Sequence, residues 1–255
     1  MSEDNHKGER IAKRIARAGL CSRREAERWI EAGRVIVNGK KLDSAACVVG
    51  DKDDIQVDNK PLPDKEGTRL FLYHKPAGLV TSHKDEKGRA TVFDNLPGNL
   101  PRVVSVGRLD LNTEGLLLLT NDGELARYLE LPATGWKRKY RVRVHGKVNP
   151  KRLASLKDGI TIEGVRYKSI IAEIEEDKTE ASKKGGANSW LNITLREGKN
   201  REIRKVMEAL GPTVNRLIRV SYGPFNLGNM NAGVAQEVKT AVIKDQVAGY
   251  FQAKK

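Results

Sequence analysis

Residues 106–123 read VGRLDLNTEGLLLLTNDG and carry the densest pattern in the chain. The apolar run Leu116–Leu119 predicts a buried strand, and a second apolar strand leads into the stretch from the other side. Between them lie residues that form turns, among them Asp110, Asn112 and Thr113. The pattern therefore predicts a loop anchored by two strands, which is how a rigid scaffold presents a reactive group.

The chain on both sides of this loop alternates short β-type runs with Gly, Pro and Asn/Asp turn signals. Helical spacing appears only briefly, and no structure is assigned after Asn231. This predicts an α+β domain with a mostly antiparallel sheet. The predicted strands are 70–73, 103–106, 116–120, 139–144, 161–162, 169–174, 190–195 and 215–222, and the predicted helices are 124–129, 151–157 and 201–210.

The first 60 residues have a different character. Apolar spacing predicts a helix over 10–18, and Ser22 with Glu25 forms a capping-box pattern that begins a second helix. Asn38-Gly39 then predicts a hairpin turn. The chain therefore divides into a small α/β domain at 1–60, a linker at 61–68, a larger domain at 69–245 and a tail at 246–255.

Composition favours a polyanionic partner, because 47 Lys and Arg face 33 Asp and Glu and the formal charge is +14. Nucleic acid is the first candidate and an anionic membrane the second, but no apolar run is long enough for a spanning helix. The N-terminus lacks a leader pattern, so we expect a soluble, cytoplasmic monomer. The two cysteines have no partner at metal-ligand spacing, so neither a metal site nor a disulfide is expected.

The two predicted helices gather many cations. Their sequence, RIAKRIARAGLCSRREAERWIEAGRVIVNGKKL at residues 10–42, resembles the S4 RNA-binding domain. A basic helical face can also be a merely solvated surface, and a DNA-binding role is disfavoured because no recognition-helix pattern is present. The resemblance implies recognition of folded RNA. The basic face comprises Arg10, Lys13, Arg14, Arg17, Arg23, Arg24 and Arg28, and the expected RNA contacts are Arg14, Arg17, Ser22, Arg23, Arg24 and Lys40.

The loop motif GRLDLNTEGLLLLTNDG is similar over its whole length to the signature of the RsuA/RluB group of pseudouridine synthases. In that family the aspartate is the catalytic nucleophile, which implies this role for Asp110. From the residues alone, Asp110 could equally cap the turn. Arg108, Asn112 and Thr113 are expected to contact the RNA.

A second element, WKRKYRVRV at residues 136–144, alternates as a strand with Tyr140 on one face and Arg141 on the other. The resemblance implies that Tyr140 stacks on a flipped uracil and that Arg141 contacts RNA. The alternative for Tyr140 is a purely structural role as a buried core aromatic. The family's K-x-Y pattern is met only loosely, because Arg138 stands where the pattern has lysine.

A third element, LREGKNREIRKVM at residues 195–207, resembles the family's C-terminal motif and implies that Arg204 pairs with Asp110. A fixed guanidinium would oppose the rise in carboxyl pKa that burial beside a base causes. Arg201 and Lys205 are expected to contact phosphates. Leu217 is expected to form the apolar floor under Tyr140, with Ile218 as the alternative.

The resemblance implies a cofactor-free isomerisation of uridine in ribosomal RNA, with Asp110 acting either on the ribose or as a proton acceptor. The motif at 85–97, DEKGRATVFDNLP, is closest to the large-subunit branch, which implies 23S rRNA or its precursor particles as the partner. The basic segment 84–89 is a hypothesis for target selection. The alternatives are 16S rRNA as substrate, or an RNA-binding assembly factor without catalysis.

Overall fold

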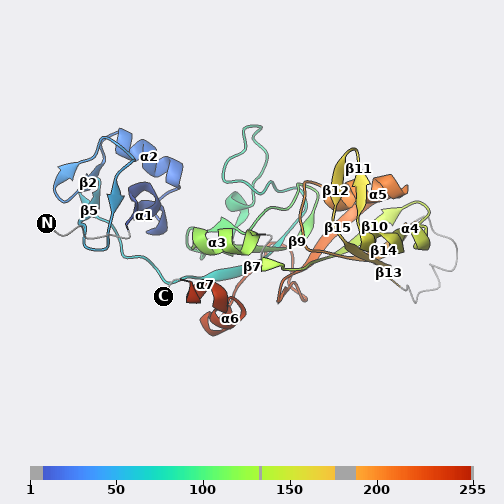
Figure 1. Ribbon diagram of the computed structural model, residues 1–255. Coiled ribbons are helices and arrows are strands. Elements are labelled where there is room, and N and C mark those ends of the chain that lie inside the picture. The colour runs from blue at the N-terminus through green and yellow to red at the C-terminus, as the bar shows by residue number, and fades with distance from the viewer. Residues whose placement is uncertain (1–7, 132–133, 176–187, 254–255) are drawn as a thin grey trace. The chain divides into compact units, whose positions relative to one another are not determined.

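The structure of the chain, a computed structural model, describes residues 8–131, 134–175 and 188–253 (Figure 1). It divides into two compact units. One, the N-terminal unit, comprises residues up to Arg69 together with 100–104 and 121–123; the other, the larger unit, comprises the remainder. The first seven residues of the predicted small domain and the last two of the predicted tail lie outside the described residues.

In the N-terminal unit, helices α1 (Ile11–Arg17) and α2 (Arg23–Glu31) pack with a four-stranded sheet around one apolar core. A separate two-stranded pair joins β1 (Glu9–Arg10) to β4 (Val48–Val49). The sheet has the order β3-β2-β5-β6 and comprises β2 (Val35–Val37), β3 (Lys40–Lys41), β5 (Ile55–Val57) and β6 (Lys60–Pro61).

Two local signals explain this unit. The Ser22 hydroxyl accepts a hydrogen bond from the Glu25 backbone N–H at 3.1 Å and thereby caps α2 as predicted. Asn38 and Gly39 both have positive φ, 51° and 75°, which is the conformation that a two-residue hairpin between β2 and β3 requires. The apolar core contains Ile11, Ile15, Ile30, Val35 and Val57, which are all at most 6% exposed.

The larger unit is built on one large sheet with the order β13-β14-β10-β15-β9-β7-β17; β16 pairs with β15 and β8 with β9. β9 and β15 run parallel, whereas the other pairings given for this sheet are antiparallel. The strands are β7 (Leu70–Lys75), β8 (Val104–Ser105), β9 (Glu114–Thr120), β10 (Arg138–His145), β13 (Ile170–Ile174), β14 (Asn188–Leu195), β15 (Thr213–Tyr222), β16 (Phe225–Asn226) and β17 (Ala235–Glu237).

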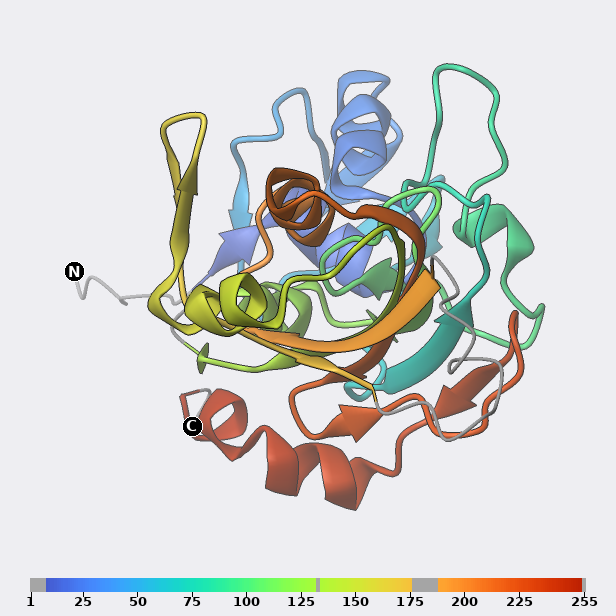
Figure 2. The same ribbon diagram turned by 90° about the vertical axis from the view of Figure 1, so that its right-hand side faces the viewer.

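Short helices cover the sheet. In Figure 2, α4 (Pro150–Ala154) and α5 (Glu202–Leu210) lie on one side of it, and α6 (Thr240–Gln246) and α7 (Ala248–Gln252) lie on the other. α3 (Gly123–Glu130) follows β9. The 3₁₀ helices Phe93–Asn95 and Ser155–Asp158 and the hairpin of β11 (Ile160–Ile162) and β12 (Val165–Tyr167) also belong to this unit.

The predicted α+β class is confirmed, and each predicted strand and helix has a counterpart within a few residues. The region after Asn231, to which the sequence patterns assign no structure, contains β17, α6 and α7. Val247 and Tyr250 are buried there, and the Tyr250 ring lies 5.5 Å from that of Tyr128. No helix among the described residues is long and apolar enough to cross a membrane.

Candidate active site

The predicted loop, residues 107–113, lies between β8 and β9 and carries Asp110. β8 pairs with β9, and the Val106 N–H donates to the Leu118 carbonyl at 2.8 Å, so the base of the loop belongs to the sheet. Within the loop, the Thr113 N–H donates to the Asp110 carbonyl at 3.0 Å and closes a tight turn. Asp110 is partly exposed at this turn, on a backbone that these hydrogen bonds fix.

Gly115 explains why β15 can lie against the end of this loop. Its φ is +103°, and a Cβ at this position would come within 2.3 Å of the Arg219 carbonyl oxygen. β15 pairs in parallel with β9 at this point, where Arg219 is opposite Gly115. Only glycine permits so close an approach of two backbones, so the Gly in the GLLLL motif has a structural reason.

Lys75, at the end of β7, forms hydrogen bonds to the loop through its side chain. Its side chain is fully buried, and its Nζ donates to the carbonyls of Pro76, Leu111 and Thr113 at 3.0, 3.3 and 3.0 Å. Burial lowers the pKa of Lys75 to about 8, although the negative charges of Asp110 and Glu114 oppose this shift. Sequence reasoning missed Lys75, because a single lysine at a strand end carries no pattern.

The segment that follows Lys75 bonds to the same loop. The Gly78 N–H donates to the Leu111 carbonyl at 2.8 Å. The Thr81 hydroxyl donates to the Leu109 carbonyl at 2.9 Å and accepts from the Leu109 N–H at 3.3 Å. The residues on both sides of Asp110 are therefore fixed by hydrogen bonds to residues 75–81.

Arg204, on α5, reaches the loop differently from what the sequence predicts. Its guanidinium donates to the carbonyls of Val214 and Asn112, both at 3.0 Å, and within the described residues it forms no ion pair with Asp110. Burial and the nearby charge of Arg201 lower the pKa of Arg204, and Asp110 opposes this. In place of the predicted pair with the Asp110 carboxylate, the Arg204 guanidinium bonds to the backbone carbonyl of Asn112, two residues later in the loop. The charge of Asp110 still acts on Arg204.

Tyr140 and Leu217 lie where strand alternation predicts. They belong to one apolar cluster with α5, and Tyr140 is 8% exposed. In the absence of RNA, Tyr140 is thus mostly a core residue with a small accessible part. Arg138, at the loosely matched motif position, donates to the Arg196 carbonyl and the Tyr222 hydroxyl at 2.7 and 2.9 Å, so its side chain already has protein partners.

The residues predicted to contact RNA fall into two groups. Ser22 is used as a helix cap, Thr113 is buried at 2% exposure, and Arg141 lies on the sheet face opposite Tyr140. The Arg141 guanidinium there forms two hydrogen bonds to Glu175 and stacks over Trp190. The RNA contacts predicted for these three residues stay predictions, as do those for the exposed residues Arg23, Arg24, Lys40, Arg108, Asn112, Arg201 and Lys205.

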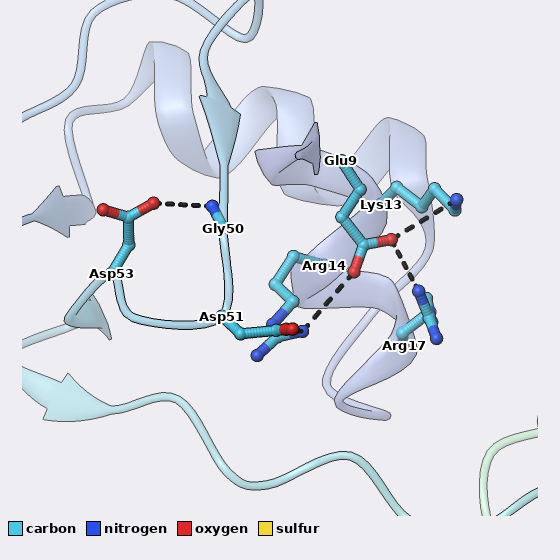
Figure 3. Close-up of polar contacts among 7 residues, drawn as sticks. All are labelled: Glu9, Lys13, Arg14, Arg17, Gly50, Asp51 and Asp53. Carbon is cyan, nitrogen blue, oxygen red and sulfur yellow. Dashed lines mark hydrogen bonds and ion pairs between the residues drawn. The ribbon is translucent and has the colours of Figure 1, made fainter. Parts of the chain in front are cut away.

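The basic face of the N-terminal unit contains an acid that the sequence pattern did not predict. Figure 3 shows Glu9 of β1 turned toward three cations of α1. The Glu9 carboxylate lies 3.4 Å from Lys13, 3.6 Å from Arg14 and 2.7 Å from Arg17, and Arg14 also pairs with Asp51 at 3.0 Å. The cations predicted to be open for phosphates are partly neutralised.

The segment predicted to select the target, residues 84–89, is an ordered turn. The Asp85 carboxylate accepts from the backbone N–H groups of Lys87 and Arg89 and forms two further bonds with the Arg89 guanidinium. These bonds hold the pKa of Asp85 well below its usual range. Lys84 and Lys87 are exposed, so the turn still presents positive charge.

Comparison with known proteins places this arrangement in a family. The family model for RNA pseudouridylate synthase matches residues 69–209, more than half of the 255-residue chain, and the S4 domain model matches residues 9–55. The chain belongs to the RNA pseudouridine synthase family. It is therefore an isomerase that acts on RNA and carries an N-terminal S4 RNA-binding domain.

Relatives of this pseudouridine synthase agree over most of its length. It is 43% identical to an uncharacterized RNA pseudouridine synthase of Rickettsia prowazekii, covering 95% of this chain and 99% of the relative. It is 43% identical to ribosomal large subunit pseudouridine synthase B of Yersinia pestis, covering 86% of this chain and 69% of that protein. A crystal structure of a pseudouridylate synthase superposes with a TM-score of 0.64 at 26% identity, covering 93% of this chain and 99% of the other.

Proposed function

We propose that this enzyme converts a specific uridine of 23S rRNA to pseudouridine and that Asp110 is its catalytic carboxylate. The single observation that carries the role of Asp110 is its place on the loop of residues 107–113, partly exposed while both neighbouring segments are fixed by Lys75, Thr81 and Arg204. The choice of 23S rRNA is supported by the 42–43% identity to relatives named for the large ribosomal subunit.

The reaction breaks the bond between N1 of uracil and C1′ of the ribose and rejoins the base through C5. Inside folded RNA this bond is inaccessible, so the nucleotide must be turned out of its stack, at a cost of roughly a few kcal/mol. The exposed cations of both units, among them Arg23, Arg24, Arg108, Arg201 and Lys205, supply phosphate contacts that offset this cost.

Asp110 then assists cleavage, either by attack on the ribose or by accepting a proton. For both roles the carboxylate must be ionised when the base covers it. Lys75 and Arg204 place positive charge near this carboxylate: each is a buried or half-buried cation that is bonded to backbone carbonyls and interacts favourably with Asp110. Tyr140, over an apolar floor that includes Leu217, stacks on the displaced uracil.

The proposal also covers where and in what form the enzyme works. Ribosomal RNA or a ribosomal precursor particle in the cytoplasm is its partner, and the protein acts as a monomer. No cofactor is needed, because the isomerisation transfers no electrons and no group from outside the substrate. The side chains just named carry only charge, hydrogen bonds and stacking, which is the chemistry that the reaction requires.

The test is modification of 23S and 16S transcripts and of precursor particles by the wild-type enzyme and by Asp110→Asn, with sites mapped by carbodiimide treatment and primer extension. We expect one new pseudouridine in 23S rRNA and a rate for Asp110→Asn at least roughly a thousandfold lower. The matched control is Glu114→Gln, because Glu114 lies beside the loop and pairs with Arg216 at 2.9 Å. It should retain activity.

The outcomes separate the parts of the proposal. Equal RNA affinity of wild type and Asp110→Asn, with loss of turnover only in the variant, supports the catalytic role. Modification of 16S rRNA alone would overturn the substrate assignment and leave the role of Asp110 standing. RNA binding with no Asp110-dependent product on any ribosomal RNA would favour an assembly factor that only binds RNA.

A further inference from the structure

Thr81 occupies an unusual position next to the proposed catalytic loop. Its side chain is buried at 5% exposure, and its one hydroxyl serves both backbone groups of Leu109, the residue before Asp110. A hydroxyl has one proton to donate and lone pairs to accept, so these two bonds use it in both directions. Leu109 lies outside the strands, since β8 ends at Ser105 and β9 begins at Glu114.

Thr81 is itself held firmly. Its neighbour Val80 forms a parallel bridge with Thr91, in which the Val80 N–H donates to Ala90 at 3.0 Å and the Val92 N–H donates to Val80 at 2.9 Å. Val92 is fully buried. A side chain on a fixed backbone transmits a defined position to the group that it bonds, whereas a side chain on a mobile loop does not.

The two flanks of Asp110 are anchored by different groups. On the C-terminal flank, Leu111 and Thr113 receive bonds from Lys75 and Gly78. On the N-terminal flank, the Thr81 hydroxyl forms both side-chain bonds that the Leu109 backbone has among the described residues. The next fixed point is Gly107, whose N–H donates to the Glu130 carboxylate at 2.6 Å. The loss of the hydroxyl would therefore free Leu109, next to Asp110, and leave Gly107 and the C-terminal flank held.

We propose that Thr81 is a positioning residue, whose hydroxyl fixes the Leu109 backbone and thereby aims the Asp110 carboxylate at the ribose of the extruded uridine. This inference rests on the proposed role of Asp110. Thr81 touches neither the substrate nor the reacting atoms; it acts through the loop. Displacement of a reacting group by about 1 Å costs on the order of a hundredfold in rate, and this is the effect expected when the hydroxyl is removed.

The experiment compares Thr81→Val, Thr81→Cys and Thr81→Ser in full-length enzyme, under single-turnover conditions with saturating RNA. Valine keeps the shape and removes the hydroxyl, a thiol is a weak donor and acceptor, and serine restores the hydroxyl. We expect the rate to fall roughly a hundredfold for Thr81→Val, to lie between the two for Thr81→Cys and to remain near wild type for Thr81→Ser. The dissociation constant for RNA should stay unchanged in all three.

The matched control is Thr91→Val. Thr91 is also buried in the Val80 bridge, but its hydroxyl bonds to Asp94 and not to the catalytic loop. This variant should turn over RNA at the wild-type rate. Hydrogen exchange gives a second measurement: the Leu109 amide should exchange faster in Thr81→Val and Thr81→Cys than in wild type, and equally in Thr91→Val.

Three results would overturn the inference: a wild-type rate for Thr81→Val, equal rate losses in Thr81→Val and Thr91→Val, or failure of serine to restore the rate. If Thr81→Val does not fold, the order serine above cysteine, together with Leu109 exchange, decides instead. Asp110→Asn is measured in parallel. If Asp110→Asn is inactive and Thr81→Val is fully active, only the positioning role of Thr81 is overturned. If Asp110→Asn is active, the proposed function itself is overturned.

Discussion

The cations of α1 in the N-terminal unit and the two cations beside Asp110 in the other unit are held in opposite ways. In the N-terminal unit, Lys13, Arg14 and Arg17 gather around the carboxylate of Glu9. In the larger unit, called the catalytic unit from here on, Lys75 and Arg204 are bonded to backbone carbonyls, and the described structure places neither in an ion pair.

The difference decides how much charge each set offers. A carboxylate cancels most of the charge of a cation beside it, whereas a carbonyl satisfies the hydrogen bonds and leaves the charge in place. Burial of Lys75 and Arg204 carries a desolvation cost, which lowers the pKa of each side chain. In return, both cations keep their charge close to Asp110. The charge of the α1 cations is instead partly offset by the Glu9 carboxylate.

The largest effect is expected from Lys75→Met, which keeps the length of the side chain and removes its three donors. The Thr113 carbonyl then loses the Lys75 bond in a buried site and the Pro76 carbonyl loses it in a partly buried one, whereas Leu111 keeps its bond from Gly78. Leaving a buried acceptor without a partner costs about 1–3 kcal/mol, so we expect the free energy of unfolding of the catalytic unit to fall by about 3 kcal/mol. Turnover should fall as well, because the loop loses its support.

Urea unfolding of the Lys75→Met variant tests this in a Trp29→Phe background. Trp136 and Trp190 then report on the catalytic unit alone, because Trp29 is the tryptophan of the N-terminal unit. Lys157→Met is the control, since Lys157 is exposed and should change stability by less than about 0.5 kcal/mol. Equal stability of the two variants would show that the carbonyls do not need the buried lysine.

A smaller effect is expected from Glu9→Gln, which removes the negative charge that partly neutralises the cations of α1. Lys13, Arg14 and Arg17 lose their common counter-charge, so RNA of any sequence should bind more tightly at low salt, by roughly tenfold at most. The slope of log K against log salt should become steeper by about one, the value for one added phosphate contact. The free energy of unfolding should fall by no more than about 1 kcal/mol.

Filter binding across a salt series, with a 23S fragment and an unrelated RNA of equal length, measures this. Glu27→Gln is the control, because Glu27 is exposed on α2 and its loss changes the net charge equally. If the two variants share one salt slope, then Glu9 does not mask the α1 cations, and the contrast between the two units is not one of available charge.

The sequence predicts the fold well, because strand alternation, the Ser22 cap and the Asn38-Gly39 turn are local signals. It also places Asp110 on an anchored loop. It fails where the cause is three-dimensional. Lys75 looks like any strand-end lysine until the sheet buries it, and Arg204 was expected on the carboxylate but reaches the Asn112 carbonyl. Glu9 was missed because it precedes the helical pattern that it neutralises.

The smallest effect concerns a carboxylate with no cation in ion-pair range among the described residues. Glu202, the first residue of α5, is 3% exposed; its Oε2 accepts from the Lys199 N–H at 2.8 Å, and its Oε1 has no hydrogen-bond partner in the described structure. Burial raises its pKa from 4.5 to about 6. Between these pH values the folded protein holds a proton that the unfolded chain has released, so stability falls as pH rises from about 4.5 to 6 and stays lower above it.

Glu202→Gln should therefore be more stable than wild type at pH 7.5, and the difference should shrink toward pH 4.5. A shift of this size corresponds to about 2 kcal/mol. The helix N-terminus favours a negative charge by about 0.3–1 kcal/mol, so a net gain of about 1 kcal/mol is expected. Thermal unfolding at a series of pH values measures the difference, with exposed Glu208→Gln on the same helix as the control. A stability difference between Glu202→Gln and wild type that does not change with pH would mean that burial does not disfavour the charged Glu202 carboxylate. Nearby cations would then neutralise it without being bonded to it.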